Sequence, residues 1–363
     1  MALNKEQLIE LIQVVARADK KAPTAFSYGE SEYSYKELNE VLRAELKELA
    51  GDYQSYRKNK TLVFELMEKA VDEILPRKVF ENMKEFADVS TIAHGDKSYY
   101  RVKTGTLRGR QFVTKGAFGG RYEAFKLGEK TFPIETEVQV AAAQVGLEEM
   151  LEKKVDFADY TDVINVGFEM MTYKEVMRHM IALGTNVQIP TNNKLASAGF
   201  DPIKFSALLG VVRAYGEPTI ICSEMFAATI RPDGNWVTDA DRAEMRSKGY
   251  IGQYNGAKVV VLPQSFFEPT NEGGDNLVVP PGMAWILPAG EEKPVKIVFE
   301  GETIVEEFAN RDYSKELQFM KKMGVALLTN PGMAVYTNTA LNNWPNVESP
   351  AGYMTPQYMY ITN

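Results

Sequence analysis

The sequence predicts an α+β fold, because the periodicity of its apolar residues changes along the chain. Helical spacing dominates residues 1–90 and returns over 159–183. Helix and strand patterns are mixed over residues 187–300. Odd positions from Leu317 to Leu327 are mostly apolar, which is the period of a long strand. With 363 residues, the chain is long enough for two or three domains and a large core.

Three amphipathic helices are predicted within the first ninety residues. Asn4 can cap the first helix, and a capping box at Ser34 and Glu37 starts the second. Gly51 stops the second helix, and the third is expected to end before Pro76. Their apolar stripes are Leu8, Leu11, Ile12 and Val15; Leu38, Val41, Leu42, Leu46 and Leu49; and Leu62, Leu66, Ala70 and Ile74.

The later elements follow from caps and short apolar runs. A strand is predicted over 134–142, with Ile134, Val138, Val140 and Ala142 on one face, and a long helix over 159–183. Asp201, Ser223 and Thr238 are expected to cap three further helices. Further strands are predicted at 218–222, 259–262, 283–287, 295–299, 334–338 and 358–361.

The charge is distributed unevenly along the chain. The formal net charge is −8, yet residues 97–130 hold nine bases and two acids, so that segment is +7 and the remainder is −15. The segment is also rich in glycine and carries short alternating runs, which predicts a long, flexible β-hairpin. We expect either a solvated basic loop or an arm that docks on an acidic surface of another copy of the chain.

Residue counts exclude several kinds of chemical site. Cys222 is the sole cysteine, so an intramolecular disulfide and a thiolate zinc cage are impossible. The two histidines, His94 and His179, cannot form a three-histidine metal site. Cys222 in an apolar strand and His179 among methionines are typical of packing residues.

Two apparent motifs fail on their spacing. The glycines of residues 116–120 lack the ending of a P-loop and the spacing of a dinucleotide fold. The acidic residues of 233–241 lack the glutamate that closes a calcium loop. We therefore expect no catalytic set, no metal and no cofactor.

Four stretches of sequence, taken in order, carry a resemblance to a known family. They are LEEMLEKKVDF at 147–157, VRAYGEPTII at 212–221, YIGQYNGAKVVV at 250–261 and NPGMAVY at 330–336. Together with the order of helical arm, basic hairpin, long helix, α/β region and terminal strands, they resemble tailed-phage major capsid proteins of the Hong Kong 97-type fold. The resemblance covers roughly residues 76–340 and leaves residues 1–75 and the tail after Ala340 unaccounted for.

The resemblance implies four parts. Residues 1–90 would form an N-terminal helical arm, either removed or retained on maturation, and residues 91–135 an extended basic β-hairpin loop that lies over a neighbouring subunit. Residues 136–186 and 301–363 would form the peripheral domain, with a spine helix at about 159–183 and long terminal strands. Residues 187–300 would form the axial α/β domain.

The function implied is structural and not enzymatic: self-assembly into hexamers and pentamers of an icosahedral virion shell around double-stranded DNA, built in the host cytoplasm. Other copies of the chain are the main partners, beside portal and scaffold or decoration proteins. DNA would be held without sequence specificity. No membrane is expected, since no apolar stretch reaches about 18 residues. The candidate contacts between subunits are Arg101, Lys103, Arg108, Arg110, Lys115, Arg121, Lys126 and Lys130.

Two alternatives stay open at this stage. One is an encapsulin-type compartment with the same fold and a protein cargo. The other is an α/β ligand-binding protein or enzyme that uses residues 187–300.

Overall fold

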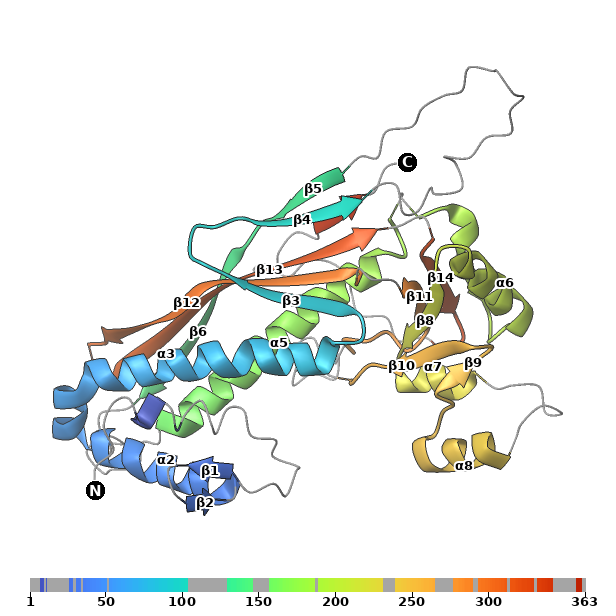
Figure 1. Cartoon of the computed structure of the whole chain (residues 1–363). Helices are drawn as coiled ribbons and strands as arrows, with labels where there is room; N and C mark the ends of the chain where they lie inside the picture. Colours follow the sequence, from blue (N-terminus) through green and yellow to red (C-terminus); the bar gives the residue numbers. More distant parts are fainter. Residues whose placement is uncertain are drawn as a thin grey trace.

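Two β-sheets and two long helices form the body of the molecule (Figure 1). The computed structural model describes residues 7–9, 11, 26–28, 31–33, 35–50, 52–103, 129–145, 157–186, 189–230, 239–264, 277–289, 293–311, 314–329, 332–341 and 357–360. This mixture of helices and sheets confirms the predicted α+β class.

The first sheet is built around two long antiparallel strands, β12 (Val295–Ala309) and β13 (Lys315–Thr329). β3 (Ala87–Ile92) extends it beside β12, while β15 (Gln357–Tyr360) and β6 (Glu137–Val145) both pair with β13. The long strand predicted over 317–327 is confirmed, and the strand predicted at 295–299 continues to Ala309. A β-bulge interrupts the pairing between Glu300 and Ile304.

Helices α3 (Tyr53–Met83) and α5 (Phe157–Ala182) cover one face of this sheet (Figure 1). We call this the inner face. Leu317, Phe319 and Met323 of β13 are buried there in the main core. The helix predicted over 159–183 is therefore observed as α5, and its burial comes from this packing.

The second sheet has the strand order β7-β14-β11-β8-β10-β9. Its strands are β7 (Lys194–Ser197), β8 (Glu217–Cys222), β9 (Gln253–Tyr254), β10 (Ala257–Val261), β11 (Met283–Ala289) and β14 (Ala334–Asn338). A short 3-10 turn, η2 (Thr191–Asn193), precedes β7.

One face of this second sheet packs on helices, and the other joins the main core. α6 (Pro202–Arg213) and α7 (Glu224–Thr229) begin at the predicted caps Asp201 and Ser223, and α8 (Asp239–Lys248) follows. Phe205 and Phe226 pack with Tyr336 on the helix side. On the opposite side, the Trp285 indole N–H donates to the Met180 carbonyl at 2.7 Å, which links the sheet to α5.

Helix α3 does not end before Pro76, as the sequence predicted, but continues to Met83. An interior proline removes one backbone hydrogen bond and costs about 3 kcal/mol. Beyond it, Val79 and Met83 are buried in the main core. Full burial of such side chains contributes roughly 1.5–3 kcal/mol each. With Leu75 just before the proline, packing outweighs the local cost.

Helix α3 also buries two stripes where the sequence indicated one. The predicted stripe, with Leu66 and Ala70, faces Leu8, Leu11 and α2 (Tyr35–Ala50). A second stripe, from Val63 through Met67 and Val71 to Leu75, lies in the main core. Much of the predicted N-terminal arm of residues 1–90 is thus built into the body. Two short strands, β1 (Phe26–Tyr28) and β2 (Ser31–Tyr33), pair with each other just before α2.

The two sheets divide the chain differently from the predicted ranges. Residues 295–300, predicted in the axial part, belong to β12 of the first sheet. β14, predicted in the peripheral part, lies in the second sheet between β7 and β11. The chain therefore makes two more crossings between the sheets than the predicted ranges imply.

Candidate assembly surface

The predicted basic hairpin is confirmed at its base. β4 (Ser98–Lys103) pairs antiparallel with β5 (Glu129–Ile134), so that Ser98 lies opposite Ile134. Three candidate contact residues lie in the paired strands of this ribbon: Arg101 is opposite Thr131, Lys103 is opposite Glu129, and Lys130 is opposite Val102. The other candidates, Arg108, Arg110, Lys115, Arg121 and Lys126, lie outside the described residues. We call residues 97–130 the basic arm.

The ribbon packs on the outer face of the first sheet, opposite the helices (Figure 1). Tyr100, Phe132 and Ile134 form one apolar cluster with β12 and β13, through Val298, Ala326 and Leu328. The Lys296 ammonium lies 4.9 Å from the centre of the Tyr100 ring, a favourable cation–π distance. The base of the basic arm is thereby attached to one half of the outer face.

The Glu300 carboxylate lies where both ends of the ribbon meet the sheet. Its Oε1 accepts from the Gly95 backbone N–H at 3.0 Å and from Lys322 Nζ at 3.2 Å, and its Oε2 accepts from the Thr136 hydroxyl. The side chain is only 7% exposed, and His94 Nδ1 lies 3.5 Å from Oε1. Hydrogen bonds from Thr136 and Gly95 outweigh burial and, together with Lys322, lower the pKa of the Glu300 carboxyl to about 2. The group is therefore ionised at physiological pH.

Gly324 allows the chain to cross the sheet beside this carboxylate. A Cβ at this position would lie 2.4 Å from the Glu135 carbonyl oxygen and 3.0 Å from Ile134 Cγ2. Because the first of these is a backbone atom, no side-chain movement would relieve the overlap. The glycine lets the connection between β5 and β6 lie directly on β13.

The other half of the outer face is open. Val138 and Val140 of β6 are 51% and 57% exposed, and Ile304 and Phe308 of β12 are 50% and 45% exposed. The register places Val140, Met320 and Ile304 in one row across three strands. The sequence grouped Val138 and Val140 with Ile134 on one strand face, but β5 ends at Ile134 and β6 begins at Glu137. Only Ile134 is covered.

Two acidic residues share this open half. Glu316 lies opposite Phe308, and Glu306 lies opposite Gln318 in the next row. We call these two acids, with Val138, Val140, Ile304 and Phe308, the open face. The ribbon of β4 and β5 contacts the opposite half, at Ala326 and Leu328, and it points away from the open face (Figure 1).

Reactive side chains elsewhere lie in the cores. Cys222 is fully buried, and burial raises the pKa of its thiol to about 12. His179 is also fully buried, and burial lowers the pKa of its imidazole to about 4, so the ring is neutral at physiological pH. Within the described ranges, no cluster of three His, Cys, Asp or Glu side chains could hold a metal ion. No helix in those ranges is long and apolar enough to span a membrane.

The comparison with protein families gives one match that extends over most of the chain. The family described as "SPbeta prophage-derived putative capsid protein YonB" matches residues 7–337. The chain belongs to this capsid protein family. The match includes the helices before residue 76, for which the sequence resemblance had given no account. These N-terminal helices of the capsid protein therefore belong to the region that is shared with the family.

Several solved structures are similar to the capsid protein at low sequence identity. A phage-related protein from Bordetella bronchiseptica RB50 has a TM-score of 0.47 and 14% identity, covering 77% of this chain and 97% of that chain. The capsid of cyanophage P-SCSP1u has a TM-score of 0.45 and 12% identity, covering 71% and 87%. The holo-SrpI encapsulin complex from Synechococcus elongatus PCC 7942 has a TM-score of 0.39 and 13% identity, covering 71% and 87%. A comparison with curated protein sequences gives no match.

The arm base of the capsid protein depends on residues that the sequence did not single out. Glu300, Thr136 and Gly324 are separated widely along the chain and meet only through the sheet. The available signal was Gly301 and Gly324 inside strand patterns, because an interior strand glycine often marks a bulge or a close backbone approach. Both glycines have these roles here.

Proposed function

We propose that this capsid protein self-assembles, without enzymatic activity, into the hexamers and pentamers of an icosahedral shell around double-stranded phage DNA. The family match over residues 7–337 carries the proposal. The shell would assemble in the host cytoplasm, with portal and scaffold or decoration proteins as further partners. The part of the chain that holds the first sheet and α5 would act as the peripheral domain, and the part that holds the second sheet would act as the axial domain. The net charge of −8 suits a wall that holds DNA without gripping its phosphates.

The basic arm is proposed as the main contact between subunits. It carries +7 in a chain whose remainder is −15, so each copy offers both members of a charge-complementary pair. Arg101, Lys103 and Lys130 would act near its base, and Arg108, Arg110, Lys115, Arg121 and Lys126 further along. Single exposed ion pairs contribute at most about 1 kcal/mol, so the effect depends on repetition around the shell.

The open face is proposed as the surface that receives the arm of a neighbouring copy. It combines exposed apolar side chains with Glu306 and Glu316. Residues 108–126 combine five bases with Phe112, Phe118 and Phe125, which is the complementary composition. The chain's own ribbon attaches to the other half of the sheet and points away, which favours an arm from a second copy.

Electron microscopy of the expressed full-length protein, with any scaffold it requires, tests the proposed function. We expect closed shells with five-fold and six-fold clusters of subunits, or the isolated pentamers and hexamers. Double-stranded DNA inside particles from infected or induced cells is expected, and enzyme cargo in its place would indicate an encapsulin-type compartment. A strictly monomeric protein at high concentration would contradict the proposal.

Two substitutions at one position test the open face. Ile304→Lys and Ile304→Asp remove the same half-exposed apolar side chain but add opposite charges. We expect the lysine variant to lower the yield of shells strongly, because it repels a basic arm, and the aspartate variant to lower it less. Sedimentation at low and high salt measures the yield, and screening should reduce the difference between the variants. Equal yields for the two variants at low salt would exclude this electrostatic role.

A further inference from the structure

The two chain segments that flank the ribbon of β4 and β5 are held by one carboxylate. Gly95, before β4, donates to Glu300 Oε1 at 3.0 Å, while Thr136, after β5, donates to Oε2. The two partners are 205 and 164 residues away from Glu300 in the sequence. The two oxygens of a single side chain therefore fix the chain on both sides of the ribbon that forms the arm base.

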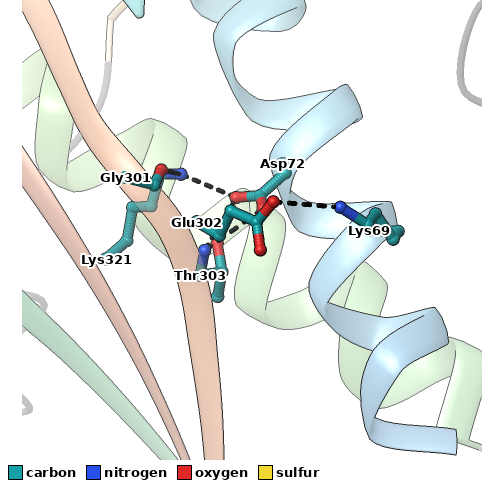
Figure 2. A network of polar contacts seen from close by, with 6 residues as sticks. All are labelled: Lys69, Asp72, Gly301, Glu302, Thr303 and Lys321. Carbon is teal, nitrogen blue, oxygen red and sulfur yellow. Dashed lines mark hydrogen bonds and ion pairs between the residues drawn. The ribbon is translucent and has the colours of Figure 1, made fainter. Parts of the chain in front are cut away.

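The position of this carboxylate is itself fixed from the inner face. Glu300 opens the β-bulge of β12, and Gly301 follows it with φ +70°. Lys321 Nζ donates to the Gly301 carbonyl at 2.7 Å and to Asp72 Oδ1 of helix α3 at 2.6 Å. Figure 2 shows Asp72 reaching the bulge from the helix, where it also accepts from the Thr303 N–H and hydroxyl. The bulge thus connects the helix layer to the base of the arm.

The outer side of the bulge is equally constrained. A Cβ on Gly301 would lie 3.2 Å from His94 Cβ and Nδ1, so the turn before β4 rests directly on the bulge. Asp96 N donates to the Ala93 carbonyl at 3.2 Å, which closes that turn. The apolar contacts of Phe132 and Ile134 are non-directional and do not by themselves prevent the ribbon from rotating, whereas Tyr100 also shares one neutral hydrogen bond of 2.8 Å with the Ser90 hydroxyl. The charged hydrogen bonds at Glu300 have defined directions and oppose such rotation.

The geometry points to Glu300 as the residue that positions the basic arm for its contact with the next subunit. This inference rests on the proposed role of the arm in assembly. Glu300 acts through Gly95 and Thr136 and makes no contact with the neighbour itself. Its loss is expected to free the arm base while the two cores remain intact, because its side-chain partners are Gly95, Thr136 and Lys322 and not core residues.

Hydrogen–deuterium exchange in the unassembled full-length subunit tests the inference. In Glu300→Gln, one oxygen that accepts a hydrogen bond becomes an amide donor, and the charge opposite Lys322 is lost. We expect exchange over residues 93–103 and 129–136 to become about tenfold faster, as for the loss of a hydrogen bond to a charged acceptor. Exchange over β8 and β11 should not change. A role in global stability alone would raise exchange in all of these segments together.

Matched variants keep the result interpretable. Glu302→Gln makes the same charge change two residues away, at an 80% exposed side chain that pairs only with Lys69 among the contacts of Figure 2. It should leave the arm base unchanged. If Glu300→Gln fails to fold, Thr136→Val removes one of the two anchors, and Thr136→Ser should restore it.

The outcomes also separate this inference from the proposed function. Equal exchange at the arm base in Glu300→Gln, Glu302→Gln and the unaltered protein would overturn the positioning role, even if the unaltered protein forms shells. Absence of shells from the unaltered protein would contradict the proposed function, but it would not affect the conclusion that the exchange experiment gives about Glu300. If the positioning role and the proposed function are both confirmed, Glu300→Gln should give fewer shells, or less regular ones, than Glu302→Gln under electron microscopy.

Discussion

Deleting residues 105–120 is expected to abolish shell assembly while the subunit remains folded. The deletion removes Arg108, Arg110 and Lys115 but leaves the paired residues of β4 and β5, with 121–128 to close the hairpin. The apolar cluster of Tyr100, Phe132 and Ile134 is likewise retained. Circular dichroism and thermal unfolding check the fold, and sedimentation with electron microscopy checks assembly. Normal shells from the deleted chain would remove the arm from the assembly mechanism.

A full-length control separates the length of the arm from its charge. Here five bases of the arm are replaced by glutamine: Arg108, Arg110, Lys115, Arg121 and Lys126. If charge carries the contact, this variant should assemble less than the unaltered chain, and the difference should be largest at low salt, where charges are least screened. If the aromatic side chains carry it, the glutamine variant should assemble and only the deletion should fail.

Much of the fold was predictable because its signals are local. Asp201 and Ser223 accept hydrogen bonds from the first turns of α6 and α7, as expected from the residues that favour helix starts. From Leu317 to Met323 the odd residues of β13 are buried and the even ones are not, because a strand alternates its faces, and that pattern is visible within one segment. β4 was likewise indicated by the alternation of residues 99–103, whereas the second alternating run, 121–127, lies outside the described residues and β5 begins only at Glu129.

The remaining features depend on partners that are distant in the sequence. Pro76 predicted a helix end by a local rule, but the main core beyond it holds Val79 and Met83 in the helix. Val138 and Val140 had the pattern of a buried face, yet the buried residues of β6 are on its other side, with Gln139 and Val145. An apolar face that is exposed in one subunit has the same sequence signal as one that is covered.

The candidate contacts were predictable as a charged segment, but their anchor was not. Nothing in the sequence around Glu300 distinguishes it from Glu302, which has the same charge and lies on the same strand. The bulge turns the two side chains to different surroundings, and only Glu300 meets the arm. The difference is visible only once three distant segments have been brought together.

Asp72→Ala is expected to lower the free energy of unfolding by about 3–5 kcal/mol, the usual effect of removing one partner from a buried ion pair. Lys321 is 2% exposed and Asp72 is 18% exposed, with 2.6 Å between Nζ and Oδ1. Without the carboxylate, the Lys321 charge retains the Gly301 carbonyl at 2.7 Å as its remaining partner in Figure 2. The Thr303 N–H and hydroxyl lose their acceptor as well. Urea unfolding of the unassembled subunit measures the change.

Two further variants test whether the Lys321 charge, left without its counter-ion, causes this loss of stability. Lys69→Ala removes the neighbouring pair with Glu302, whose side chains are 43% and 80% exposed, and should cost less than about 1 kcal/mol. Asp72→Ala combined with Lys321→Met removes both charges, so it should be more stable than Asp72→Ala alone, because no buried charge is left without a counter-ion. A double variant no more stable than the single one would mean that the lost Thr303 contacts, and not the Lys321 charge, hold helix α3 against the bulge. In that case the coupling between the helix and the base of the arm would depend on hydrogen-bond geometry alone.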